Sequence, residues 1–300
     1  MCEHDDFDEF ARRPGPLTRR QFGVMAMGAG LAAMLPSLAN AAETKGTDVV
    51  IKTADGDADA YFVHPVKGKH PGVLIWPDIF GLRPAFREMA TRLAGAGYSV
   101  LVINPFYRTR KAPTAPDHAD FNDPATRQAL MSLMGTLSPD TALTDARAFL
   151  AFLDGQAAVD KKKKIGTIGY CMGGPFVMRT AAAFPERIGA GATFHGGGLV
   201  TDKPDSPHLL IPRMKAHFLI AIAENDDGKQ PANKDVLRDS FAKANLPAEI
   251  EVYAGTMHGW CPTDSQVYNH DQAEKAWSRM LALFSSSLAQ AGRERSAPGE

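Results

Sequence analysis

Short apolar runs recur along the chain, and most of them are separated by segments with the periodicity of a helix. Those with the length of buried strands span residues 72–76, 99–103, 165–168, 191–194 and 218–223. Further strands are predicted over 249–253 and over 49–53 and 58–64, which alternate or run apolar around the hairpin signal Asp55-Gly56. The other segments place apolar residues three or four positions apart, which predicts helices over residues 83–96, 124–137, 139–153, 174–183, 233–244 and 271–288. Strands that alternate with helices predict the α/β fold class, with a mostly parallel sheet and helices on both faces.

Residues 1–41 differ in character from the rest of the chain. Arg19 and Arg20 precede a mildly apolar run, residues 23–35, which is shorter than the roughly 20 residues of a membrane-spanning helix. An Ala-x-Ala site follows, and these features together are typical of a twin-arginine (Tat) export signal; the alternative is a basic tail ahead of a buried helix. We therefore predict that the Tat export machinery recognises residues 1–41, which are then cleaved off. Residues 42–300 are expected to form a single domain, periplasmic or secreted, with no stable membrane anchor after cleavage.

The composition excludes some classes of function but identifies none. The formal net charge of −1 argues against a nucleic-acid-binding protein, which usually has a basic excess or a basic face. The chain has 3 cysteines, of which Cys2 would be lost with the export signal. Cys171 and Cys261 are too few for a disulfide framework, even in an oxidising compartment, so each needs its own explanation.

Cys171 lies in the segment with the strongest chemical signature. A predicted strand runs directly into Gly169-Tyr170-Cys171-Met172-Gly173, and a predicted helix follows. This is the pattern of a nucleophile elbow, with cysteine in the place of the usual serine. The helix that begins there offers unpaired N–H groups and the positive end of its dipole, which favour a thiolate and an oxyanion. The alternative is a structural cysteine that is merely buried beside a glycine-rich turn.

A cysteine nucleophile needs a base and a group that orients this base. In folds with a nucleophile elbow, the acid and then the histidine follow the nucleophile along the chain. Asp226 follows the predicted strand that ends at residue 223, and His258 follows the last predicted strand. We therefore predict that Asp226 orients His258, with Asp227 as a rival acid and Glu224 as a weaker one.

Of the 9 histidines, His195 is the only other one in a notable segment. The sequence His195-Gly196-Gly197-Gly198 is similar to the oxyanion-hole motif of some lipases. That motif precedes the nucleophile in the chain, whereas this one follows Cys171. We therefore interpret it as a backbone turn near the site.

The chain resembles the dienelactone hydrolase family over roughly residues 49–288. The resemblance rests on the sequence Trp-Pro-Asp-Ile-Phe-Gly at residues 76–81, on the cysteine elbow, on Asp226 and on His258-Gly259-Trp260. It implies an α/β-hydrolase fold and a carboxylic ester hydrolase that forms an acyl-enzyme through a Cys-His-Asp triad.

The resemblance also suggests roles for single residues around the nucleophile. In that family the position of Asp78 is typically a glutamate that interacts with the cysteine and controls its proton. The backbone N–H groups of Ile79 and Met172 would hold the oxyanion. Arg127 lies where one of two carboxylate-binding arginines is expected, but Pro262 occupies the position of the other. Because one arginine binds a carboxylate less strongly than two, the resemblance implies the chemistry but not the dienelactone substrate.

Four further residues complete the expected site. Phe80, Tyr107 and Trp260 are candidates for the walls of the substrate pocket, although each could equally be part of an ordinary core. Cys261 is expected to pack behind Trp260, too far from Cys171 for a disulfide. The alternative is a disulfide that acts as a redox latch.

The sequence as a whole predicts an exported hydrolase whose partner is a small-molecule ester or lactone. No cofactor and no metal are implied. Two alternatives differ in class from this interpretation. One is a non-catalytic binding protein on the same scaffold; the other is a thioesterase or a peptidase that uses the same three side chains.

Overall fold

The structure is a computed structural model that describes residues 41–116 and 119–288. The predicted export signal lies outside these residues, apart from its last position. Within them, an eight-stranded sheet has the order β1-β2-β4-β3-β5-β6-β7-β8. The strands are β1 (Thr44–Thr53), β2 (Gly56–Pro65), β3 (Gly72–Trp76), β4 (Ser99–Ile103), β5 (Ile165–Tyr170), β6 (Ile188–Phe194), β7 (His217–Ala223) and β8 (Ala248–Tyr253).

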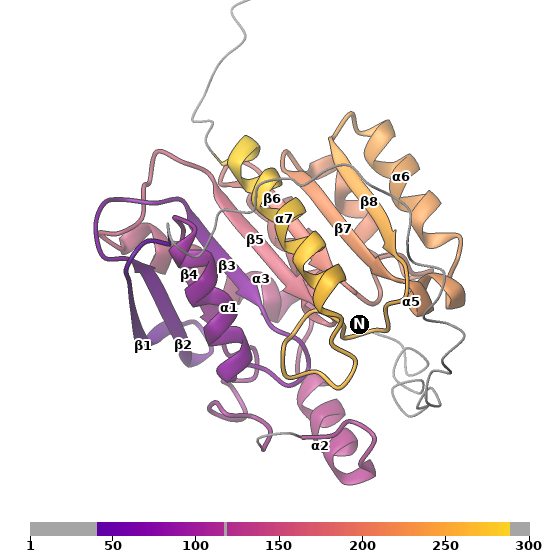
Figure 1. Cartoon of the computed structure of the whole chain (residues 1–300), viewed down its shortest axis with the longest axis horizontal. Helices are drawn as coiled ribbons and strands as arrows, with labels where there is room; N and C mark the ends of the chain where they lie inside the picture. The colour runs from indigo at the N-terminus through magenta and orange to yellow at the C-terminus, as the bar shows by residue number, and fades with distance from the viewer. Residues whose placement is uncertain (1–40, 117–118, 289–300) are drawn as a thin grey trace, which may run out of the picture.

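The helices cover both faces of this sheet (Figure 1). They are α1 (Pro84–Gly95), α2 (Pro124–Met134), α3 (Pro139–Gly155), α4 (Gly173–Ala183), the 3₁₀ helix η5 (Pro207–Arg213), α5 (Glu224–Lys229), α6 (Asn233–Lys243) and α7 (His270–Ser287). Buried side chains of α1 and α7 pack in one core, and those of α3, α4 and α6 pack in the core on the other face. The predicted α/β fold class is therefore confirmed.

The six strands from β4 through β3 to β8 are parallel to one another, whereas β1 and β2 form an antiparallel hairpin at one edge, and β2 is also antiparallel to β4. The parallel strands β3, β4 and β5 are buried at every position, which explains why they read as continuous apolar runs in the sequence. Parallel strands end at the same side of a sheet, so the segments that follow them are brought together there.

Two features of the chain differ from the predicted elements. The edge strand β1 begins at Thr44 rather than at residue 49, because residues 44–48 pair with β2 although most of them are exposed and polar. Apolar periodicity cannot reveal such a segment, since neither of its faces is buried. The short helices α5 and η5 were also missed; α5 has no buried residue, so it lacks an apolar stripe.

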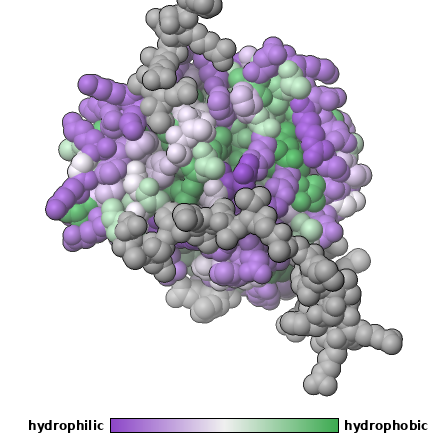
Figure 2. Space-filling model, turned by 45° about the horizontal axis from the view of Figure 1, so that its top comes forward, coloured by the Kyte–Doolittle hydropathy of each residue, from purple (hydrophilic) through white to green (hydrophobic). Residues whose placement is uncertain are grey.

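The surface carries few large exposed hydrophobic side chains. In the part of the chain that the structure describes, these are Val50, Val66 and Leu209. Figure 2 shows one face of the molecule, on which hydrophilic side chains dominate the periphery and hydrophobic ones lie between them. None of the helices formed by the described residues is both long and apolar enough to cross a membrane.

Candidate active site

Four adjacent parallel strands are each followed, at their carboxyl ends, by one candidate site residue. Cys171 follows β5, His195 follows β6, Asp226 lies just beyond β7, and His258 lies just beyond β8. The carboxyl edge of a parallel sheet is the usual position for a ligand site in an open α/β fold. The sheet topology therefore gathers residues that are far apart in the sequence.

The turn at Cys171 has the tight strand-to-helix geometry expected from its glycines. Cys171 adopts a φ of 51°, in the left-handed region that non-glycine residues seldom occupy. Its backbone N–H donates to the carbonyl of Phe194 at 3.1 Å, which ties the turn to β6. A Cβ atom at Gly173 would lie 2.3 Å from the carbonyl oxygen of Trp76, so only glycine fits where α4 begins. The surroundings thus fix Cys171 between β5 and the N-terminus of α4.

His258 is held by the short helix α5. Its Nδ1 lies 2.7 Å from Oδ2 of Asp226, and its backbone N–H donates to Oδ1 of Asn225 at 2.8 Å. These two contacts fix both the imidazole and the backbone of the loop after β8. An imidazole whose Nδ1–H is bound by a carboxylate presents Nε2 as an acceptor, which is the tautomer that a general base requires.

The two rival acids have other partners. Glu224 accepts a hydrogen bond from the backbone N–H of Gly255 at 2.6 Å, so it supports the loop rather than the imidazole. Asp227 forms an ion pair with Lys234 at 2.7 Å. Among the three acids, Asp226 is therefore the one whose contact suits the orientation of a histidine base.

The expected oxyanion donors lie beside the thiol. Ile79 and Met172 belong to the same buried cluster as Cys171, together with apolar side chains of α2. The hydrogen bonds formed among the described residues use the backbone N–H of neither Ile79 nor Met172. Two donors without a protein acceptor next to a nucleophile are what an oxyanion site needs.

Asp78 is already bound by a cation. Its two carboxylate oxygens accept from Arg83 at 2.6 and 2.9 Å, and Oδ1 also accepts from the backbone N–H of Phe80 at 3.0 Å. Arg83 donates in addition to both oxygens of Asp264. Burial by itself would lower the pKa of Arg83, but the two carboxylates outweigh it and raise this pKa, so the guanidinium stays charged. The role expected for Asp78, control of the thiol proton, thus competes with its role in this Asp–Arg–Asp cluster.

Two neighbouring cavities open at the carboxyl edge of the sheet. The smaller one, of about 20 Å³, is lined among others by Ile79, Phe80, Phe121, Cys171, His195 and His258. The larger one, of about 360 Å³, shares Asp78, Phe80, Phe121 and Gly259 with it. Phe80 therefore lies where a pocket wall was expected, between the two cavities.

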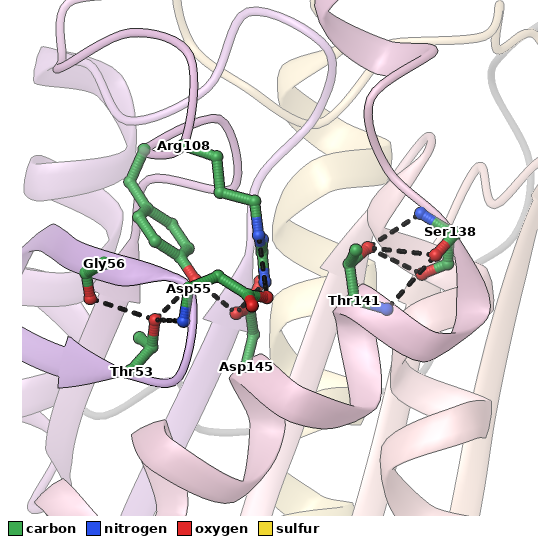
Figure 3. A network of polar contacts seen from close by, with 8 residues as sticks. Thr53, Asp55, Gly56, Arg108, Ser138, Thr141 and Asp145 are labelled. Carbon is green, nitrogen blue, oxygen red and sulfur yellow. Dashed lines mark hydrogen bonds and ion pairs between the residues drawn. The ribbon is translucent and has the colours of Figure 1, made fainter.

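Tyr107 lies away from these cavities, contrary to the expectation that it forms a pocket wall. Its hydroxyl donates to Asp145 at 2.7 Å and lies 2.7 Å from the hydroxyl oxygen of Thr53. Arg108 joins Asp145 to Asp55 in the same network, which links α3 to the β1–β2 turn (Figure 3). The hydroxyl of Tyr107 is thus satisfied within a structural network, and its ring packs in the core.

Trp260 and Arg127, which were expected to contact the substrate, also lie away from the two cavities. Trp260 is fully buried and stacks on Tyr253, with ring centroids 4.8 Å apart. It therefore belongs to the core under the site, because a large aromatic ring gains most when it is removed from water. Arg127 lies on α2, and the described residues that line the two cavities do not include it.

Cys261 is buried in the core that also contains Trp260, as expected, whereas Cys171 belongs to the cluster with Ile79. No disulfide joins Cys171 and Cys261 in the part of the chain that the structure describes. Burial raises the pKa of the Cys261 thiol well above its usual value, which keeps it protonated and unreactive. The structure gives no support to the redox latch.

The described residues include no group of three or more His, Cys, Asp or Glu side chains placed to hold a metal ion. Two residues of the site, Arg83 and His195, had no predicted side-chain role. Arg83 carried no signal beyond its proximity to Asp78. His195 had one that was not used, since it follows a predicted strand just as Asp226 and His258 do.

Comparison with known proteins relates the chain to one family. The model of the dienelactone hydrolase family matches residues 58–288. A carboxymethylenebutenolidase of Rhodococcus opacus is 26% identical over 220 residues, which cover 72% of this chain and 81% of that protein.

Two solved structures share the fold at lower sequence identity. A dienelactone hydrolase-like promiscuous phosphotriesterase from metagenomic libraries has a TM-score of 0.66 and 21% identity, and the match covers 82% of this chain and 99% of that one. An acylaminoacyl peptidase of Pyrococcus horikoshii has a TM-score of 0.59 and 15% identity, over 86% of this chain and 43% of that one. Since the family model matches most of the chain, this protein belongs to the dienelactone hydrolase family and is a hydrolase that acts on ester or lactone bonds.

Proposed function

We propose that this protein cleaves carboxylic esters or lactones through an acyl-enzyme formed on Cys171. The observation that carries the proposal is the 2.7 Å contact between Asp226 and His258, whose imidazole lines the same small cavity as the cysteine. A nucleophile, a base and a group that orients the base are the minimum for covalent acyl transfer. The test is turnover of 4-nitrophenyl esters by the wild-type protein and by the variants described in the Discussion.

In the proposed mechanism, His258 accepts the proton of the Cys171 thiol while the sulfur attacks the substrate carbonyl. The oxyanion that forms lies against the backbone N–H groups of Ile79 and Met172, each of which would contribute about 3 kcal/mol to the stability of the transition state. The imidazolium, stabilised by Asp226, returns its proton to the leaving alkoxide. Water activated by His258 then attacks the thioester and releases the acid.

The Asp–Arg–Asp cluster has a supporting role in this proposal. Asp78 is held by Arg83 and in turn accepts the N–H of Phe80, so it fixes the loop that carries Ile79. This arrangement supports an oxyanion donor whose direction is set before the substrate binds. It leaves the control of the thiol proton mainly to His258.

The larger cavity favours neutral substrates over anionic ones. Its lining contains the carboxylates of Asp78, Glu88, Asp120 and Asp264 but one guanidinium, that of Arg83. Since this excess of negative charge repels anions, we expect a lactone that bears a carboxylate to have a kcat/KM at least tenfold below that of its neutral carboxamide. The difference should shrink in concentrated salt, which screens exposed charges. A higher kcat/KM for the carboxylate would contradict this prediction.

We also propose that the protein is exported by the Tat machinery and acts in the periplasm or outside the cell. The proposal is supported by the paired Arg19 and Arg20 and by the Ala-x-Ala site, which lie in the sequence before the domain. Cell fractionation tests it. We expect the wild-type chain in the periplasm or the medium, and the chain with Lys in place of both arginines in the cytoplasm; equal distributions would contradict export by this route.

A further inference from the structure

His195 is a buried polar residue whose side chain the mechanism does not use. It is 1% exposed and lines the small cavity that also contains Cys171 and His258. Neither of its ring nitrogens has a hydrogen-bond partner among the residues that the structure describes. Buried polar groups are almost always paired, because an unpaired one has lost its bonds to water without replacement. An unpaired ring in a catalytic cavity therefore points to a ligand as its partner.

The ring of His195 is held by its surroundings rather than by its own hydrogen bonds. The backbone N–H donates to the carbonyl of Ala221 at 2.8 Å, and the residue adopts a φ of 42°. The ring meets that of His258 edge-on at 5.0 Å and that of Tyr170 at 6.0 Å. Its orientation is thus fixed before any substrate arrives, which lowers the entropy lost on binding.

The imidazole of His195 is neutral at ordinary pH. Burial, and next to it the proximity of His258, lower the pKa of His195 well below its usual value. A neutral imidazole offers one N–H donor and one acceptor, and no charge. It is therefore suited to a neutral polar group and not to a carboxylate.

The size of the cavity limits what this polar group can be. About 20 Å³ beside Cys171 is room for roughly one water-sized group, whereas the neighbouring cavity of about 360 Å³ has room for a much larger part of a substrate. An acyl part that lies in the small cavity, with the alcohol part in the larger one, has to be short. A hydroxyl group both donates and accepts, so it can pair with the ring in either tautomer.

We propose that His195 binds a hydroxyl group on the acyl side of the substrate, next to the scissile carbonyl, so that the preferred substrates are esters of short 2-hydroxy acids. The inference rests on the hydrolase function proposed above and assigns its acyl specificity. A site that hydrogen-bonds a substrate hydroxyl discriminates strongly against an analogue that lacks it, because the polar group of the site is then left unpaired.

The test compares two esters of similar size, 4-nitrophenyl glycolate and 4-nitrophenyl propionate, in which a hydroxyl replaces a methyl group. The quantity of interest is the ratio of their kcat/KM values, divided by the ratio of their rates of alkaline hydrolysis, which removes the difference in intrinsic reactivity. We expect this normalised ratio to exceed ten for the wild type. His195→Phe, which keeps the ring shape without its nitrogens, should lower the ratio at least tenfold.

Two further variants separate recognition from folding. His195→Asn keeps a donor and an acceptor and tolerates the left-handed backbone, so we expect it to retain most of the preference even if His195→Phe folds poorly. His208→Phe is the matched control, because the ring nitrogen of His208 lies 2.7 Å from the hydroxyl oxygen of Ser206 and the residue does not line the small cavity. The control should leave the ratio unchanged.

The outcomes distinguish this inference from the proposed function. If His195→Phe lowers kcat/KM equally for both esters, the ring only positions His258 and the inference is wrong. A wild-type ratio near one is equally against it, while turnover of the propionate that depends on Cys171 would leave the hydrolase function intact. A wild-type protein that cleaves neither ester would overturn the function and the inference together.

Discussion

Cys171→Ala is expected to lower kcat for ester hydrolysis by at least a thousandfold while the protein stays folded. The substitution removes the sulfur that would form the acyl-enzyme, and the described residues that line the small cavity offer no other thiol or hydroxyl. When residues act as a unit in covalent catalysis, removal of the nucleophile alone typically lowers kcat about as much as removal of all of them. Alanine keeps the Cβ atom, so the turn with φ of 51° is no more strained than before.

The measurement is steady-state turnover of 4-nitrophenyl propionate, with thermal unfolding as the check of folding. Cys261→Ala is the matched control, since Cys261 is the other buried thiol and packs in a different core. It should keep kcat within about threefold and cost roughly 1 kcal/mol of stability. Activity of Cys171→Ala above about one percent of wild type would remove Cys171 as the nucleophile.

The second large loss of activity is expected on substitution of Asp226, the acid that contacts His258. Asp226→Asn should lower kcat at least a hundredfold with little change in KM. The amide can donate to Nδ1 of His258, which favours the tautomer with the proton on Nε2, and that nitrogen can then no longer accept the thiol proton. The fold should survive, because Asn225 still holds the backbone of the histidine loop.

Asp227→Asn provides the comparison for this variant. It removes the same charge one residue further along α5, where the partner is Lys234 rather than His258. We expect kcat to stay within about threefold of wild type, since a partly exposed ion pair contributes at most about 1 kcal/mol to stability. Equal losses in the two variants would mean that the acidic segment acts through its overall charge, and Asp226 would lose its specific role.

The sequence by itself determined the fold class and the positions of three site residues. Buried parallel strands are continuous apolar runs, so they can be recognised without knowledge of their neighbours. Cys171 directly follows such a run, and Asp226 and His258 follow later predicted strands within a few residues, where parallel strands end at one edge of the sheet. Both the strands and the residues that follow them are specified by the local pattern and by the order of the chain.

Tertiary structure decided which of several similar side chains makes each contact. Asp226 and Asp227 are adjacent in the sequence, but successive residues on a helix point about 100° apart, so only the packing of α5 selects the one that meets His258. Tyr107 and Trp260 were expected at the pocket and lie in the cores, because burial of an aromatic ring depends on the elements that surround it.

The sequence could not predict the hydrogen-bond and ion-pair partners of the site residues, for a related reason. Arg83 joins Asp78 to Asp264, which lies 181 positions further along the chain, and no local pattern specifies so distant a contact. The sequence also cannot show that the ring nitrogens of His195 have no hydrogen-bond partner among the described residues, because this depends on where all the neighbouring side chains lie. Periodicity records whether a side chain is buried, whereas the identity of its partner is set by the packing of distant segments.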